Sequence, residues 1–217
     1  FEASIWKGAS LYQRLVKFEV KELERSVQIE YTHLLPVAEG AKVISTYEVF
    51  QDGRINVKLT YKGQNNLPLM PDFGVTFKVP EEYNRFKYYG YGPSANYVDR
   101  MEGARLGIFE TTAKENFAKY LNPQESGNRC NVRWAEVKND RGLGLKISGE
   151  NLNVSVLPYT IHEIENAAHH YELPNSYHTV VKISYKHLGI AGDDTWGARP
   201  HDEYLMDASK DMVLEFN

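Results

Sequence analysis

KVISTYEVFQDGRINVKLTY, residues 42–61, is the stretch that decides the fold. Apolar and polar side chains alternate through residues 43–49 and again through residues 55–61, which is the period of a strand with one buried face. Between the two runs stands the pair Asp52-Gly53, and an Asp-Gly pair in that position is a strong signal for a β-hairpin. We therefore expect two antiparallel strands joined by a tight turn.

The same alternation extends outward from this hairpin in both directions. It appears before the hairpin in residues 16–23 and 27–31, and after it in residues 75–79. The charges of residues 17–25 alternate in sign, so we interpret them as the solvent face of a strand and not as a binding patch. These segments predict a meander of antiparallel strands, each with one face in a core.

The second half of the chain has a less regular pattern. Residues 88–97 and 123–129 are expected to be structured loops. Residues 160–170 are the one good helical candidate, with Thr160 as N-cap and Glu163 in a capping-box position. Further strands are expected at residues 132–137, 143–147, 154–157, 180–185 and 212–216. The sequence therefore predicts an all-β fold, a large antiparallel β-sandwich with one short helix.

Composition limits the classes of function. The 217 residues carry a formal charge of −4 and have a pI near 6.0. A nucleic-acid-binding protein usually has an excess of basic residues, so this composition argues against that class. The sequence has no run of about 18 apolar residues, so no membrane-spanning helix is expected. The single cysteine, Cys130, is expected to be a small buried hydrophobe. The chain begins at Phe1 without a Met or a signal sequence, which suggests a piece of a longer chain.

Histidines are the obvious candidates for metal chemistry, and their spacing argues against it. His162-Glu163 begins like a zinc-peptidase motif, but Asn166 stands where the second histidine ligand is needed. His169 and His170 are expected to end the predicted helix, where polar or positive side chains interact favourably with the helix dipole. We expect no metal site and no catalytic residue in this chain.

The segment GIAGDDTWG, residues 189–197, is the strongest candidate for a site. Adjacent carboxylates, Asp193 and Asp194, stand between glycines, so they either shape a functional loop or cap backbone amides in an Asx-turn. Trp196 either offers a flat apolar face on which a sugar ring can stack or packs against the edge of the sandwich. The residues alone leave both alternatives open.

Several strings of residues resemble, in order and spacing, the C-terminal domain of family 2 β-galactosidases, the region called the small chain. Thr195 stands where that family has Ser, which is a mild departure. The matching strings are WKGA at residues 6–9, YGYGP at 89–93, NYVDR at 96–100, PQESGNRC at 123–130, His169 with Leu173, and GIAGDDTW at 189–196. The resemblance therefore covers nearly the whole chain.

The resemblance implies a supersandwich of the galactose-mutarotase type, formed as a single domain by residues 1–217 and belonging to a longer chain. It implies that Trp196 reaches into the active site and stacks on the galactoside, and that Asp193 and Asp194 shape its loop. The acid/base and nucleophile glutamates belong to a barrel domain outside these residues. The chain alone is therefore expected to be inactive, since retaining glycosidases need that pair of carboxyls.

The resemblance also implies the partners. They are a galactoside substrate and the rest of the parent enzyme, which is expected to be a homo-oligomer. No cofactor is expected in this chain, and any magnesium or sodium of the parent enzyme belongs to its barrel. The compartment is left open between the bacterial cytoplasm and the periplasm.

Two other classes of function stay open beside this one. An aldose epimerase on the same fold would need a histidine acid and a carboxylate base facing one sugar. The available side chains are His162, His178, His187, Glu163 and Glu165. A free carbohydrate-binding module would instead use Trp196 together with residues 88–97.

Overall fold

The computed structural model describes residues 2–217 of the chain. These residues gather into two compact units. Unit 1 consists of residues up to 74 together with residues 185–217, and unit 2 consists of residues 75–184. The prediction that residues 1–217 form a single domain stays a prediction.

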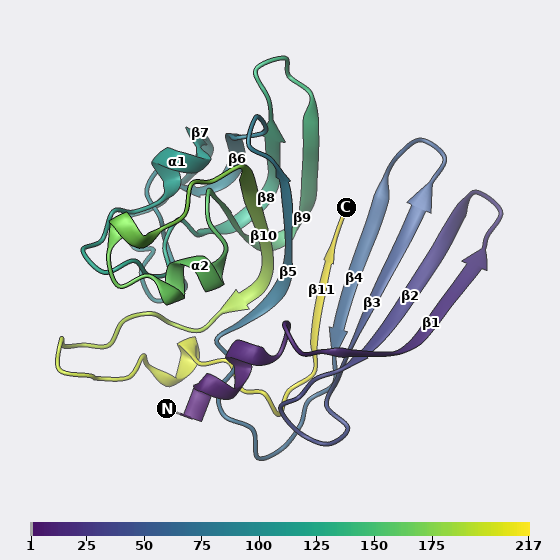
Figure 1. The fold of residues 1–217 in the computed structure, drawn as a ribbon, viewed down its shortest axis with the longest axis horizontal. Helices are drawn as coiled ribbons and strands as arrows, with labels where there is room; N and C mark the ends of the chain where they lie inside the picture. The colour runs from purple at the N-terminus through teal and green to yellow at the C-terminus, as the bar shows by residue number, and fades with distance from the viewer. Residues whose placement is uncertain (1) are drawn as a thin grey trace. The chain divides into compact units, whose positions relative to one another are not determined.

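Unit 1 contains a five-stranded antiparallel sheet in the order β1-β2-β3-β4-β11 (Figure 1), which confirms the first four strands of the predicted meander. Residues 75–79, the expected last strand of the meander, lie instead in β5 (Asp72–Pro80), a strand of the second sheet. At the β3–β4 hairpin, Val49 pairs with Ile55, and Gly53 adopts φ +86°, which glycine reaches without a steric penalty. The strands are β1 (Arg14–Glu22), β2 (Ser26–Leu34), β3 (Lys42–Phe50), β4 (Ile55–Tyr61) and β11 (Met212–Phe216). The prediction of an Asp-Gly hairpin is confirmed.

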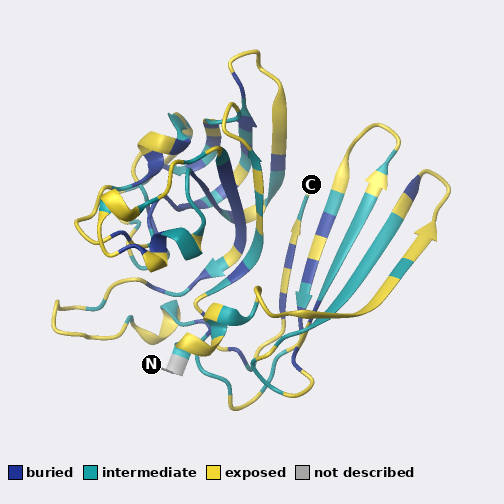
Figure 2. Cartoon of the chain, in the orientation of Figure 1, coloured by how far each residue is buried: buried dark blue, intermediate teal, exposed yellow. Residues whose placement is uncertain are grey.

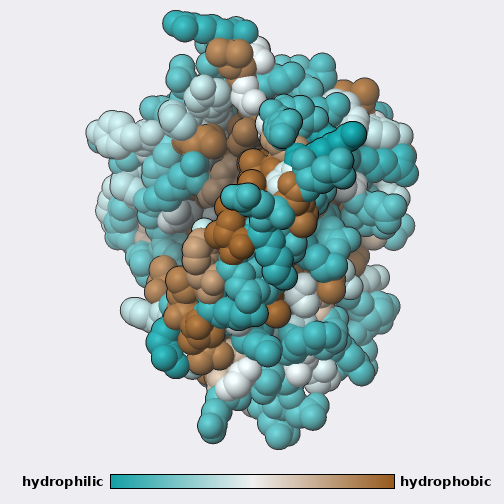
Figure 3. Space-filling model, turned by 90° about the vertical axis from the view of Figure 1, so that its right-hand side faces the viewer, coloured by the Kyte–Doolittle hydropathy of each residue, from teal (hydrophilic) through white to brown (hydrophobic). Residues whose placement is uncertain are grey.

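One face of this sheet is apolar along the cross-strand row of Val20, Ile29, Tyr47 and Val57. The row is buried at β4, where Val57 is 9% exposed, and open at β1, where Val20 is 51% exposed (Figure 2). The prediction that every strand of the meander buries one face is therefore wrong for β1, where Val16, Phe18 and Val20 are each at least 45% exposed. Figure 3 shows hydrophobic residues reaching the surface among hydrophilic ones.

The second sheet lies mainly in unit 2 and has the strand order β5-β10-β9-β8-β6-β7. Its strands are β5 (Asp72–Pro80), β6 (Arg85–Gly92), β7 (Arg105–Thr112), β8 (Arg129–Lys138), β9 (Gly144–Leu157) and β10 (His178–His187). The core of unit 2 is made of side chains that point inward from β6, β8, β9 and β10. Its most deeply buried members include Phe86, Tyr88, Val132, Val137, Val154, Val156, Val181 and Ile183.

The expected loop at residues 88–97 is wrong in its first half, because β6 continues to Gly92. Tyr88, Gly90 and Gly92 alternate as buried positions on one face of that strand. A Cβ atom on Gly90 would lie 2.9 Å from a methyl carbon of Val132 on the neighbouring strand β8. Glycine is used here for close strand packing and not for a turn, which is why the glycine content misled the prediction.

The helix prediction is confirmed at its start and wrong at its end. Helix α2 (Ile161–Asn166) begins after Thr160, and Thr160 and Glu163 exchange the two hydrogen bonds of a capping box. The helix stops at Asn166, so His169 and His170 do not end it. His169 instead precedes a separate 3₁₀ turn, η2 (His170–Glu172).

The described residues contain one further short helix, α1 (Ala113–Asn116), and two further 3₁₀ turns, η1 (Glu2–Gly8) and η3 (Asp202–Tyr204). Helix α1 was not predicted, because one turn of helix carries too few residues to show a period. Two mainly antiparallel sheets with a few short helices make this an all-β fold of the sandwich class, as predicted. No helix within residues 2–217 is long and apolar enough to cross a membrane.

Candidate functional site

The candidate site is the Trp196 loop, residues 189–200, which leaves strand β10 in unit 1. Its base is closed where the Gly189 amide donates to the carbonyl oxygen of Tyr204 at 2.9 Å. Tyr204 lies in η3, the 3₁₀ turn that follows the loop. At the other end of the loop, Trp196 is 93% exposed. The alternative that Trp196 packs against a sheet edge is therefore wrong.

The carboxylate of Asp194 fixes the backbone on both sides of Trp196. One of its oxygens accepts hydrogen bonds from the amides of Trp196 at 2.7 Å and Ala198 at 3.2 Å. Gly197 takes φ +104°, and a Cβ atom on Gly192 would overlap the carbonyl oxygen of Ala198. The loop is thus a tight turn that only glycine permits at these two positions, with the Asx-type capping that its sequence suggested.

Asp193 is held from outside the turn by a residue that the sequence did not single out. Both of its carboxylate oxygens contact Nε2 of His201, at 3.0 and 2.9 Å. The hydrogen bond and the charge of Asp193 raise the pKa of His201 above its ordinary value. The spacing of eight residues between the two matches no common motif, so the sequence offered no signal for this pair.

The geometry of the loop suits binding rather than chemistry. Asp194 is engaged by two amides and Asp193 by His201, so both carboxylates brace the loop. Trp196 projects from that brace as a large, flat and solvated apolar surface. Such a ring can gain by covering the apolar face of a ligand, since removing apolar area from water is favourable.

Two of the histidines considered for an epimerase, His178 and His187, stand at opposite ends of strand β10. His178 Nε2 lies 3.8 Å from Glu163 Oε2 in unit 2, and that oxygen also accepts from the Thr160 backbone amide. His187 lies in unit 1, where its Nε2 is 3.6 Å from Asp72 Oδ2. Within residues 2–217, no group of three or more His, Cys, Asp or Glu side chains is arranged to hold a metal ion.

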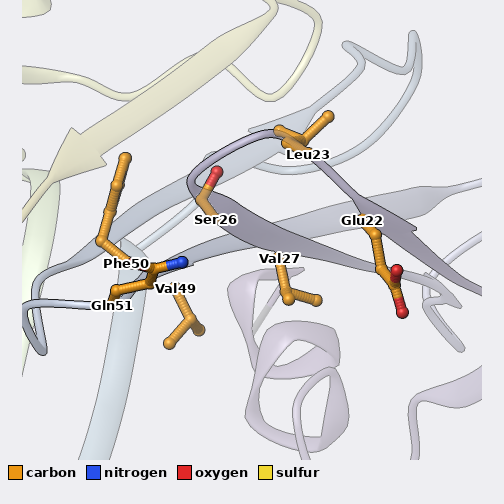
Figure 4. A pocket seen from close by; sticks show the side chains of 7 residues that line it. All are labelled: Glu22, Leu23, Ser26, Val27, Val49, Phe50 and Gln51. Atoms are coloured by element: carbon orange, nitrogen blue, oxygen red, sulfur yellow. The ribbon is translucent and has the colours of Figure 1, made fainter.

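A shallow hollow of about 350 Å³ lies at the turns of the β1–β2 and β3–β4 hairpins (Figure 4). Its described lining is Glu22, Leu23, Ser26, Val27, Val49, Phe50 and Gln51. Of these, Glu22 alone carries a carboxyl, so the hollow lacks the pair of carboxyls that a glycosidase uses.

Cys130 is 6% exposed, which confirms the prediction of a small buried thiol. Burial raises the pKa of Cys130 to about 12, although a hydrogen bond from Asn128 acts in the opposite direction. We expect no reaction of folded Cys130 with an aromatic disulfide reagent at pH 8, because the thiolate is the reactive form. The same reagent should react with one thiol per chain in urea. Reaction in native buffer as fast as in urea would contradict the buried position.

The fold and the loop together define an all-β protein that presents an exposed tryptophan on a braced turn. A family model described as "Beta galactosidase small chain" matches residues 2–217, so the chain belongs to the β-galactosidase small-chain family. This confirms the resemblance to a small-chain region.

Relatives agree with this assignment. A β-galactosidase of Halalkalibacterium halodurans is 38% identical over 222 residues, which cover 100% of this chain and 22% of that protein. A β-galactosidase of Streptococcus thermophilus is 39% identical over 218 residues, covering 100% of this chain and 21% of that protein. A β-galactosidase small subunit of Latilactobacillus sakei is 32% identical over 212 residues, covering 92% of this chain and 66% of that subunit. The chain thus spans about a fifth of the two longer relatives.

Proposed function

We propose that this chain is the region of a family 2 β-galactosidase that supplies an aromatic stacking surface to the galactoside site. The observation that carries the proposal is Trp196, which is 93% exposed although the turn beneath it is fixed on both sides. An exposed ring on a fixed base loses little conformational entropy when a sugar covers it. Asp193 and Asp194 serve this function as braces of the turn.

The reaction itself belongs to the rest of the enzyme. Hydrolysis of a glycoside with retention needs two carboxyls about 5 Å apart on either side of the scissile bond. The Halalkalibacterium and Streptococcus relatives are named β-galactosidases and are about five times as long as this chain, which leaves room for a catalytic barrel elsewhere. We propose that this chain acts only with that barrel, in a homo-oligomer, and holds no cofactor of its own.

The purified chain alone should not hydrolyse a chromogenic β-galactoside, because the proposed catalytic carboxyls lie outside it. It should bind galactoside weakly, since one stacked ring forms a single wall of a pocket. Release of the chromophore at high protein concentration measures the first expectation, and quenching of tryptophan fluorescence by galactoside measures the second. Turnover that survives purification and disappears when an acidic residue of this chain is replaced would contradict the proposal.

A free carbohydrate-binding module would use the same exposed Trp196 without a barrel. The fluorescence titration separates the two functions. A module that works alone should bind galactoside as tightly in isolation as in any longer chain, whereas a region of a composite site should gain affinity when the barrel is present.

A further inference from the structure

His201 contacts Asp193 and so links the exposed part of the Trp196 loop to its base, the point where Gly189 and His201 bond to Tyr204. We call the contact between His201 and Asp193 the tie. The His201 ring contacts both carboxylate oxygens of Asp193, eight residues earlier in the chain. The base is anchored because the His201 carbonyl accepts from the Tyr204 amide at 2.9 Å, and the Tyr204 carbonyl accepts from Gly189. The rings of His201 and Tyr204 also stack, with centroids 6.3 Å apart and planes at 22°.

Asp193, which His201 holds, is next to the residue that orients Trp196. Asp193 is followed directly by Asp194, whose carboxylate caps the Trp196 amide. A displacement of Asp193 therefore moves the cap and the direction of the indole together. Asp193 and His201 are both solvent-exposed, so their contact adds little to the core and acts mainly on the geometry of the loop.

We propose that His201 is a positioning residue for the galactoside site, one that holds the Trp196 loop in its binding geometry through the protonated imidazole and Asp193. This inference rests on the proposed function of Trp196 and names the residue that regulates it. It makes galactoside binding dependent on the charge of a side chain that touches neither substrate nor indole.

The charges that face His201 set the direction of this dependence. Asp193 contacts it from the loop, and Asp202 and Glu203 face it from η3. All three carboxylates favour the imidazolium, and Asp193 does so most strongly, so the pKa of His201 is raised. The ionic part of the tie is therefore complete below the ordinary pKa of histidine and is lost as the pH rises through the raised pKa, above which a neutral imidazole keeps one N–H donor.

The test compares His201→Arg, which keeps a positive charge, with His201→Gln, which keeps a neutral donor, in the β-galactosidase that contains this chain. At pH 6, His201→Gln should have a KM for galactoside about threefold above that of the native enzyme, with a smaller change in kcat, as an exposed ion pair allows. His201→Arg should have the native KM. Between pH 6 and pH 9, the ratio of the native KM to that of His201→Arg should rise by the same factor.

A second measurement, proteolysis, reports how rigid the Trp196 loop is in the absence of galactoside. Chymotryptic cleavage after Trp196 at pH 6 should be about threefold faster in His201→Gln than in the native enzyme or His201→Arg, since loosening an exposed ion pair opens the turn by that order. Cleavage after Tyr177, which is 77% exposed and lies outside the loop, serves as the reference in each sample. Thermal unfolding should be the same for all three proteins.

The possible failures are distinguishable. Equal cleavage rates after Trp196 in the three proteins would overturn the tie. Unequal cleavage with equal KM values would overturn its link to galactoside binding. If instead Trp196→Ala leaves KM unchanged, the stacking function fails, and with it the positioning role of His201.

Discussion

Replacement of Trp196 by alanine, in the longer enzyme proposed for this chain, is expected to lower kcat/KM for a β-galactoside by about 5- to 150-fold. The range corresponds to about 1–3 kcal/mol for stacking on an aromatic side chain, by analogy with nucleic-acid bases. The midpoint of thermal unfolding should not change, because an indole that is 93% exposed contributes almost no buried area. Steady-state kinetics and a thermal melt on the same preparation measure both quantities.

Two further variants separate stacking from a general effect on the protein. Trp196→Phe retains an aromatic face and should keep part of the lost activity. Tyr177→Ala removes another exposed aromatic ring, 77% exposed and outside the loop, and should leave kcat/KM within about twofold of native, the size of effect usual for a surface substitution. Unchanged KM and kcat in Trp196→Ala together with a lower unfolding temperature would mean that the residue is structural.

The fold could be predicted wherever one period held over a whole strand. Strand β4 shows strict alternation after an Asp-Gly turn, its hairpin partner β3 alternates less regularly, and β11 was predicted at residues 212–216, as observed. Strand β6 was missed because close packing against β8 requires glycine at position 90, and glycine also marks loops. The exposure of β1 could not be predicted, because its alternation is the same as that of a buried strand.

The candidate site could be predicted in its local part only. Glycines at 192 and 197 and the carboxyl of Asp194 shape a turn through contacts with near neighbours in the chain, and such contacts leave a pattern in the sequence. The pairing of Asp193 with His201 depends on the path of the backbone after the turn, and no sequence pattern predicts that path. His178 and His187 differ from this pair, because they stand at the two ends of strand β10, which was predicted at residues 180–185.

The largest effect on stability is expected at Asn96, one of the residues of the string NYVDR. Its side chain is 2% exposed in unit 2 and satisfies three backbone groups. The amide nitrogen donates to the carbonyl oxygens of Tyr91 and Ser94, each at 2.9 Å, and the amide oxygen accepts from the Cys130 amide at 2.8 Å. Asn96 therefore joins the end of β6 to β8, and its role is structural.

Asn96→Asp should destabilise the protein by about 3–5 kcal/mol at pH 7, the order found when a buried charge has no partner. The substitution keeps the shape and the bond to Cys130, but it places a carboxylate oxygen against the carbonyl oxygens of Tyr91 and Ser94. Protonation restores a donor, so the introduced carboxyl will have a higher pKa when folded than when unfolded. The loss should then be small below the unfolded pKa of aspartate and grow as the pH rises. Urea unfolding at pH 4 and pH 7 measures this, with Asn175→Asp, an exposed position with the same change of charge, as the control. Equal urea midpoints for the two variants at pH 7 would show that the two bonds donated by the Asn96 side chain contribute nothing to stability.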